Sequence, residues 1–479
     1  MDFQSRYDRN DFLKFLRNDF LWEKFEEHVE QTSITKEFKS SFFTSITKLW
    51  VVEEFDNLIV LEIEHKSKND ARISLTKDIF KLLRQFELEW LLRQNALVIL
   101  KNSDTEQYRF SLLTTTYNED FEEKLSNPKR YSFLLGKWEK TKTPEDYLKN
   151  KVVNFEDLVW RFDVEVVRDE FFNHYLTLYL KLYKAITDDK EFVELLEKDN
   201  VEIVSFTKNL LWKIVFIYFI QKKGWLWVKR GGEYWINWDI DFMRSIWKDF
   251  KKWEKDVLEK HEYFYNDYLE WLFFAWLNKD NTDNDDFNEY FNKKVPYLNG
   301  WLFKEDYKGW RNNISHISND VFSNEKEEWI LDVFDTYNFT IDEDDLYDSD
   351  IAIDPEMLGR IFEKMIWIDE KNIEKIVNIY DEKAKKRKDG YVKMDIEKWN
   401  VWNNNKKLGA FYTPREIVHY MTKESLIHYL INNLQWKKED KEKQIRTLFE
   451  VKEKFLLSEK EFKDNKLSED IFNEIWGII

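Results

Sequence analysis

The sequence predicts an α+β protein that is predominantly helical. Short apolar runs with a two-residue period, which is typical of strands, lie before about residue 120. Between residues 155 and 276, apolar side chains instead recur every three to five residues, which is typical of helices. The 479 residues suggest about three domains. We expect an α/β domain at 1–145, a helical connector domain at 146–345 and a third region at 346–479.

The first region is expected to contain elements in the order helix, strand, strand, helix, strand, strand. The helices are predicted at 1–30 and 71–93, and the strands at 46–53, 58–65, 96–100 and 108–114. This order is typical of a small α/β or α+β unit.

The central region contains one strongly apolar run, at 210–220. It is 11 residues long, which is too short to cross a bilayer, so we expect a buried core helix. The stretches 278–290 and 341–350 are rich in Asn and Asp or in acidic residues, and we expect loops or domain boundaries there.

Two helix starts are predicted in the last region. Asp354 and Pro355 have the residue types of an N-cap and a first helical position. Thr413, Pro414 and Glu416 have the spacing of a capping box, in which the first and last side chains each accept a backbone N–H. We therefore expect helices to begin at these two points.

Composition and charge restrict the classes of function. Lys and Arg number 75 and Asp and Glu number 93, so the net charge of −18 excludes nucleic-acid binding by the whole surface. The basic run 383–388 is either a local binding patch or a solvated helix end. The absence of cysteine excludes disulfides, thiol nucleophiles and cysteine-ligated metals. The charged start of the chain and the lack of a long uncharged apolar window favour a cytoplasmic protein that does not enter a membrane.

A pattern of charged side chains on one predicted strand is the first candidate site. The two-residue period of the strand at 58–65 places Glu62, Glu64 and Lys66 on one face, and Asp56 precedes the strand. Asp56 and Glu64 would supply carboxylate oxygens to a divalent metal such as Mg²⁺, while Lys66 would stabilise the charge that develops on a phosphate. The pattern and the strand order resemble the PD-(D/E)XK nuclease core, which implies that Asp56, Glu64 and Lys66 are catalytic. The alternatives are a solvent-exposed charged strand and a degenerate nuclease domain kept for its structure.

The second candidate site is a short segment that precedes the second predicted helix. It consists of Gly409, Ala410, Phe411, Tyr412, Thr413 and Pro414. Glycine lets the backbone approach a ligand closely, two aromatic rings can enclose a flat group, and a helix N-terminus favours a carboxylate. The alternative is an ordinary loop that leads into a capped helix.

Together with residues 415–418, this segment resembles motif X of adenine-N6 DNA methyltransferases. Further segments resemble, in family order, single-chain type IIG restriction–modification enzymes: 130–136, 209–211, 219–226, 295–303 and 354–363. The resemblance extends over residues 55–430. It implies a nuclease-like N-terminal domain, a helical connector and the start of a Rossmann-like domain in which 409–414 bind S-adenosylmethionine.

The resemblance implies site-specific adenine-N6 methylation of double-stranded DNA in host defence, coupled to Mg²⁺-dependent cleavage. In the family, a glycine-rich motif I and an (N/D)PPY motif follow motif X, and this sequence contains neither. None of its five prolines are adjacent, which excludes the second motif. We therefore expect the N-terminal part of a longer or split enzyme, which needs a second chain or further residues to methylate DNA. The alternatives are a non-catalytic DNA-binding or scaffold subunit and an inactive gene fragment.

The numbers of tryptophan and glycine are unusual. The chain has 22 Trp and 10 Gly, whereas average composition would give about 34 glycines. Trp138, Trp212, Trp227 and Trp301 stand where the resembling family typically has glycine. We hypothesise that many of these residues are glycine in the organism, encoded by a reassigned UGA codon. The alternative is an AT-rich genome that encodes genuinely abundant aromatic residues.

Overall fold

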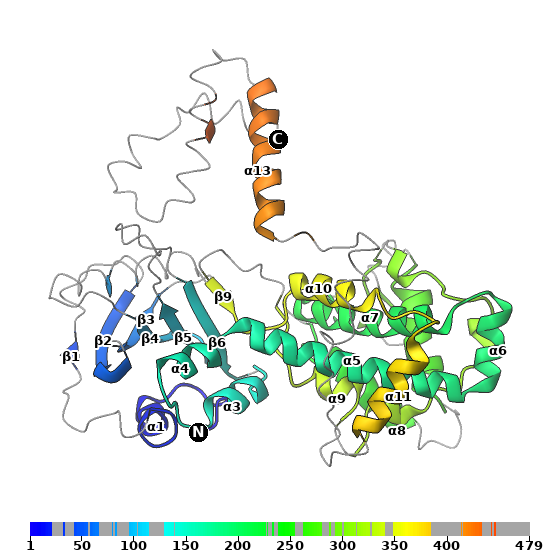
Figure 1. The fold of residues 1–479 in the computed structure, drawn as a ribbon, viewed down its shortest axis with the longest axis horizontal. Helices are drawn as coiled ribbons and strands as arrows, with labels where there is room; N and C mark the ends of the chain where they lie inside the picture. The colour runs from blue at the N-terminus through cyan, green and yellow to red at the C-terminus, as the bar shows by residue number, and fades with distance from the viewer. Residues whose placement is uncertain are drawn as a thin grey trace.

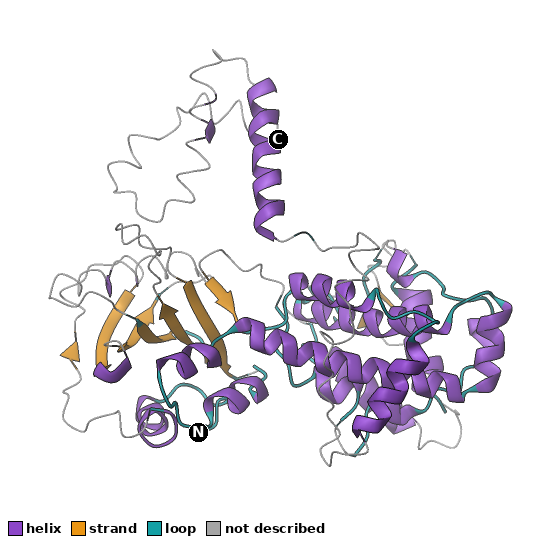
Figure 2. Cartoon of the chain, in the orientation of Figure 1, coloured by secondary structure: helices purple, strands orange, loops and turns teal. Residues whose placement is uncertain are grey.

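A mixed β-sheet and a group of helices form two adjacent lobes of the computed structural model (Figure 1). Figure 2 shows that the strands gather in the N-terminal lobe and that the other lobe is almost entirely helical. The structure describes residues 1–21, 32–33, 43–55, 58–66, 79, 82–83, 95–102, 104–114, 129–137, 139–226, 228, 232–233, 238–253, 262–279, 287–288, 293–298, 301–312, 314–325, 328–340, 348–384, 413, 415–433, 442 and 445–446. The mixed fold confirms the predicted α+β class.

The large sheet has seven described strands in the order β1-β2-β3-β4-β5-β6-β9. Their bounds are β1 Thr32–Ser33, β2 Phe43–Val52, β3 Leu58–His65, β4 Ala96–Lys101, β5 Gln107–Thr114, β6 Lys129–Gly136 and β9 Asp348–Asp350. The pairs β3–β4 and β6–β9 are parallel, and the other neighbours are antiparallel. The strand predicted at 58–65 is confirmed with its bounds, and those at 46–53, 96–100 and 108–114 are confirmed with ends shifted by a few residues.

Successive apolar side chains of β3 point to opposite faces of the sheet, and each face is buried in a different core. Leu58 and Val60 belong to a large core that includes Phe12 and Phe15 of helix α1, Arg9–Phe15. Ile59, Leu61 and Ile63 belong to a second core on the opposite face, together with Ile79, Leu82 and Leu83. These last three residues are helical, in agreement with the helix predicted at 71–93, most of which lies outside the described residues.

The N-terminal helix is shorter than predicted. Asp8 caps α1 by accepting a hydrogen bond from the backbone of Asp11, and a π-helical stretch, Leu16–Phe20, follows Phe15. Residues 22–30, which complete the helix predicted at 1–30, lie outside the described part of the chain.

Three described strands of the sheet, β1, β6 and β9, were not predicted. β6 lies in a segment, 130–136, that the sequence connects only with the family resemblance. The prediction of a loop at 341–350 is wrong for Asp348–Asp350, which pair with Arg130–Ser132 as β9. Residues of the predicted third region therefore contribute to the sheet of the first, and the boundaries at 145 and 345 remain a prediction.

The second lobe consists of helices around the long helix α5, which extends from the sheet into this lobe (Figure 1). Its α-helices are α5 Val164–Asp188, α6 Lys190–Lys198, α7 Ile203–Lys222, α8 Phe242–Trp253, α9 Ile330–Phe334, α10 Pro355–Met365 and α11 Ile373–Ala384. Helices α3 Lys142–Leu148 and α4 Phe155–Arg161 lie beside the sheet, and α13 Arg415–Asn433 lies apart from both lobes (Figure 1). Two π-helical stretches, Tyr265–Leu269 and Trp271–Trp276, and a small hairpin of β7, Phe287–Asn288, and β8, Lys293–Lys294, complete the described elements that matter here. The hairpin shows that the loop predicted at 278–290 contains a short strand.

Helix α7 is the core helix predicted from the run at 210–220, but it is longer, with 20 residues. In the described part of the chain, α7 is the one helix long and apolar enough to cross a membrane, and 67% of its most apolar window is buried. It packs against α5. This burial supports the assignment as a core helix.

Helix α10 begins where the sequence predicts. The side chain of Asp354 accepts a hydrogen bond from the backbone of Met357 at 2.6 Å, and Pro355 occupies the first turn. Met357, Leu358, Ile361 and Met365 are buried on one side of the helix. The N-cap prediction is therefore confirmed.

Candidate functional site

The C-terminal end of β3 carries Glu62 and Glu64 from the face of the first predicted site, and Lys66 follows the strand. Glu62 is 1% exposed, although the sequence pattern placed it on the face expected to bind metal. Arg9 donates two hydrogen bonds to its carboxylate, at 2.8 and 2.5 Å, and the Tyr7 hydroxyl donates a third at 2.5 Å. Lys101, at the end of β4, approaches the same carboxylate at 2.9 Å. Glu62 is thus enclosed by the segment that precedes and begins α1.

The electrostatics of this cluster favour a fixed negative charge on Glu62. Burial alone would raise the pKa of Glu62, but the hydrogen bonds from Arg9, Tyr7 and Lys101 outweigh burial and lower the pKa from 4.5 to about 2. The hydrogen bond to Glu62 raises the pKa of Arg9, and burial followed by the charge of Glu62 raises that of Tyr7. The carboxylate is therefore an internal counterion for two cations.

Glu64 and Lys66 are more accessible than Glu62. Glu64 is half-buried, and one carboxylate oxygen accepts a hydrogen bond from Ser45 of β2 at 3.3 Å. It lies beside Lys101 in the parallel register of β3 and β4. Lys66 directly follows the strand and is exposed. The structure therefore brings Glu62, Glu64 and Lys101 together at one end of two neighbouring strands.

Asp56, the remaining residue of the first predicted site, lies outside the described residues, two positions before Leu58 in the sequence. The metal pair of Asp56 and Glu64 therefore stays a prediction. Among the described residues, no group of three or more His, Asp or Glu side chains is arranged to hold a metal.

The second predicted site is described only at its end. Gly409, Ala410, Phe411, Tyr412 and Pro414 lie outside the described residues, whereas Thr413 is described and is exposed directly before α13. The side chain of Glu416 is also outside the description, so the capping box stays a prediction. The described chain does confirm a helix that begins at this point.

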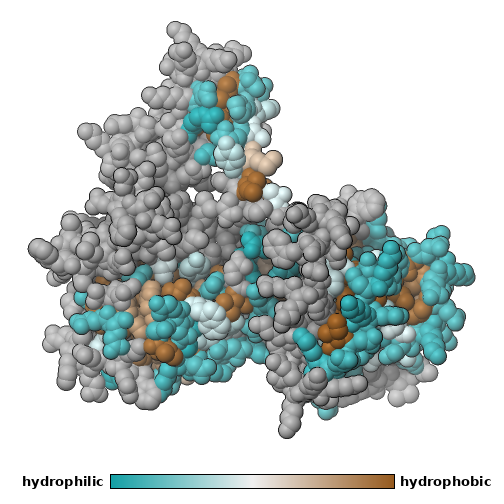
Figure 3. Space-filling model, viewed as in Figure 1, coloured by the Kyte–Doolittle hydropathy of each residue, from teal (hydrophilic) through white to brown (hydrophobic). Residues whose placement is uncertain are grey.

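Helix α13 has an unusually apolar surface. Its exposed apolar side chains, part of which form hydrophobic surface in Figure 3, are Ile417, Val418, Tyr420, Met421, Leu426 and Tyr429. Ile427, Leu430 and Ile431 are buried. A helix that is apolar on most of its sides is typically covered by neighbouring elements.

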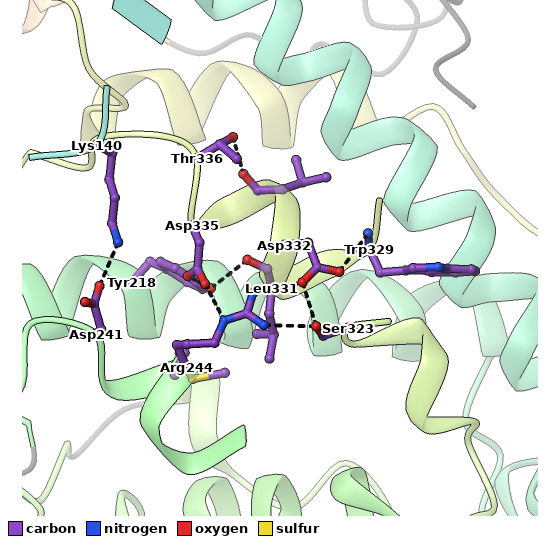
Figure 4. Close-up of polar contacts among 12 residues, drawn as sticks. Lys140, Tyr218, Asp241, Arg244, Ser323, Trp329, Leu331, Asp332, Asp335 and Thr336 are labelled. Carbon is purple, nitrogen blue, oxygen red and sulfur yellow. Dashed lines mark hydrogen bonds and ion pairs between the residues drawn. The ribbon is translucent and has the colours of Figure 1, made fainter. Parts of the chain in front are cut away.

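A cluster of charges in the helical lobe was not predicted (Figure 4). Arg244 of α8 donates to Asp332 at 2.9 Å, to Asp335 at 2.6 Å and to Ser323 at 2.9 Å. Tyr218 of α7 donates to Asp335 at 2.8 Å. Burial opposes the charge of Arg244, but the two carboxylates outweigh burial and raise its pKa. These groups are hydrogen-bonded to one another, so the cluster holds α7 and α8 against α9. No local sequence pattern predicted it.

A small pocket lies beside this cluster, where the two lobes meet. Lys140, Tyr218, Lys222, Asn338 and Phe339 are among its lining residues. Lys140 pairs with Asp241 at 2.8 Å, and Lys222 lies 3.5 Å from the buried carboxylate of Glu139. Because both lysines already have carboxylate partners, the pocket is not an open site for an anion.

Comparison with known proteins gives one relationship of interest. A Methanocaldococcus jannaschii protein, named as a candidate type II restriction enzyme and methyltransferase, is 27% identical over 225 residues. The matched region is 46% of this chain and 14% of the length of that protein. No protein-family model matches the chain. No solved structure matches it either. The similarity supports a relationship to restriction–modification enzymes.

Proposed function

We propose that this chain is part of a restriction–modification enzyme that methylates adenine at N6 in a specific DNA sequence. The observation that carries the proposal is the similarity to a relative named for both restriction and methylation. The segments that resemble type IIG enzymes, from 130–136 to 409–418, occur in family order and support the adenine specificity.

The proposed methyl donor is S-adenosylmethionine, which supplies an electrophilic methyl group when it is bound. Residues 409–414 would hold its methionine end, with Phe411 and Tyr412 beside the cofactor and the N-terminus of α13 facing its carboxylate. The exposure of Thr413 and of the first turns of α13 fits an open side at this position. The apolar surface of α13 would be covered by the remainder of the methyltransferase domain, supplied by further residues or by a second chain.

The residues that hold the target base would lie outside this sequence, because it has no Pro-Pro pair. We therefore expect the chain alone to be unable to methylate DNA. With the missing parts present, the target adenine would be flipped out of the duplex, as other enzymes that modify bases require.

The experiment is co-expression of the chain with the reading frames that flank its gene, followed by mapping of N6-methyladenine in the host DNA. We expect methylation at one short sequence, lost in the variants Phe411→Ala and Tyr412→Ala. Val153→Ala, at a side chain that is 72% exposed, is the control and should leave methylation unchanged. Methylation that persists in both test variants would refute the proposed cofactor segment.

Mg²⁺-dependent cleavage by the N-terminal sheet is a separate part of the proposal. Glu64 and Lys66 at the end of β3 support it, whereas the pairing of Glu62 with Arg9 and Lys101 favours a scaffold role for the same face. In the complete enzyme, Glu64→Ala and Lys66→Ala should abolish cleavage and leave methylation intact. Asp56→Ala tests the third predicted residue. Unchanged cleavage in Glu64→Ala and Lys66→Ala would assign the sheet to the scaffold alternative.

A further inference from the structure

Residues 338–340 and 348–354, which we call the strap, contact the helical lobe, the sheet and the start of α10. At its start, the side chain of Asn338 forms two hydrogen bonds with the backbone of Lys140, which lies between β6 and α3. The amide nitrogen of Asn338 donates to the Lys140 carbonyl, and its oxygen accepts from the Lys140 N–H, both at 2.9 Å. The strap is thus anchored at the junction of the two lobes.

The middle of the strap extends the sheet. Asp348, Ser349 and Asp350 form β9 and pair in parallel with Arg130, Tyr131 and Ser132 of β6. The backbone N–H of Ile351 continues this pairing, because it donates to the carbonyl of Ser132 at 2.9 Å. β9 is therefore the last described strand on this side of the sheet.

The end of the strap fixes the start of α10. The N–H of Ile353 donates to the Asn338 carbonyl at 2.8 Å, and the N–H of Thr340 donates to the Ile353 carbonyl at 2.9 Å. The buried carboxylate of Asp354 caps α10 and also pairs with Arg168 of α5 at 2.9 Å. Only four residues separate β9 from Pro355, and the hydrogen bonds of Ile351, Ile353 and Asp354 hold this connection at both ends.

We propose that the strap mechanically couples the edge of the sheet to α10. A displacement of β6 would move β9, and the short hydrogen-bonded connection would pass that displacement to the first turn of α10. Coupling of this kind acts in both directions, so a change at the α10 cap must also reach β6. The coupling itself does not depend on the proposed function. If that function is correct, the strap links the state of the nuclease-like sheet to the helix that precedes the cofactor segment.

The test is hydrogen–deuterium exchange of the whole chain, read in the peptides 129–136 and 355–365. Successive N–H groups of a strand point to opposite edges, so the N–H of Ser349 faces β6, as that of Ile351 does, and the N–H of Asp350 faces away. Ser349→Pro removes a donor of the ladder, whereas a proline at Asp350 removes none. We expect Ser349→Pro to accelerate exchange about tenfold in both peptides. Asp350→Pro should match Asp350→Ala, which reports the loss of the carboxylate alone.

If Ser349→Pro does not fold, a substitution at the other end of the strap tests the proposed coupling. Asp354→Ala removes the cap of α10, and coupling requires faster exchange in 129–136 as well as in 355–365. Asp354→Asn keeps the capping ability but loses the charge that pairs with Arg168, and should have a smaller effect. The proposal is overturned if either perturbation changes exchange at its own end of the strap only, or if the two proline variants behave alike.

Discussion

Arg9 holds the buried carboxylate of Glu62 through two hydrogen bonds, at 2.8 and 2.5 Å, across 53 positions of sequence. This pairing attaches α1 to the end of β3, with Tyr7 and Lys101 completing the cluster. The strand face that the sequence suggested for metal binding is therefore partly used to hold the N-terminal helix on the sheet.

Arg9→Ala should destabilise the sheet lobe by about 2 kcal/mol, because it removes the bidentate partner of a buried charge. The partial exposure of Arg9, 38%, keeps the loss below that expected for a fully buried pair. Urea unfolding measures the change. Lys14→Ala, which removes an exposed pair with Asp11, is the control and should change the stability by less than about 0.5 kcal/mol. Equal effects of the two substitutions would contradict this account of the cluster.

Glu62 should also make the protein sensitive to acid. Its pKa is lowered in the folded state from 4.5 to about 2, so the unfolded chain binds the proton more readily than the folded one. The stabilisation is present above the unfolded pKa and is lost as the pH falls from about 5 to 2. Unfolding free energies measured through this range should fall less steeply in Glu62→Gln than in the native protein. Parallel pH profiles for the two proteins would exclude a role for Glu62.

Local sequence patterns correctly predicted the elements that form through interactions between neighbouring residues. The alternation along Leu58–His65 gave β3, and the cap at Asp354 gave the start of α10, because both depend on neighbouring residues. β9 has the sequence Asp-Ser-Asp, which has low strand propensity and forms a strand only because β6 offers an edge.

At the predicted nuclease-like site, too, the sequence pattern indicates local geometry but not the contacts that the tertiary fold makes. The two-residue period placed Glu62 and Glu64 on one face of β3 correctly. It carried no information about Arg9 and Tyr7, which reach Glu62 through the tertiary fold.

The identity of the tryptophans is a prediction that mass spectrometry can decide. Trp138 and Trp227 lie outside the described residues. Trp212 lies inside helix α7, where φ is negative, and Asn200 is the one non-glycine residue for which the structure shows positive φ in the described part of the chain. Backbone strain therefore does not support the hypothesis at Trp212, and the hypothesis rests on composition and resemblance. Peptides of the native protein should contain glycine at 227 and 301; tryptophan at both would contradict the hypothesis.

The buried pair of Lys213 and Asp306 should show strongly non-additive stability effects. Lys213 is 1% exposed within α7, its ammonium contacts Asp306, and the ring of Phe274 lies 4.7 Å from the same nitrogen. Burial lowers the pKa of Lys213 and raises that of Asp306, so each charge depends on the other. Asp306→Ala leaves the ammonium buried without this partner and should cost about 3 kcal/mol, whereas Lys213→Met combined with Asp306→Leu replaces both charges with apolar groups and should cost much less. Urea unfolding of Lys213→Met, Asp306→Leu and their double variant gives the coupling energy, and additive losses would show that the two charges do not depend on one another.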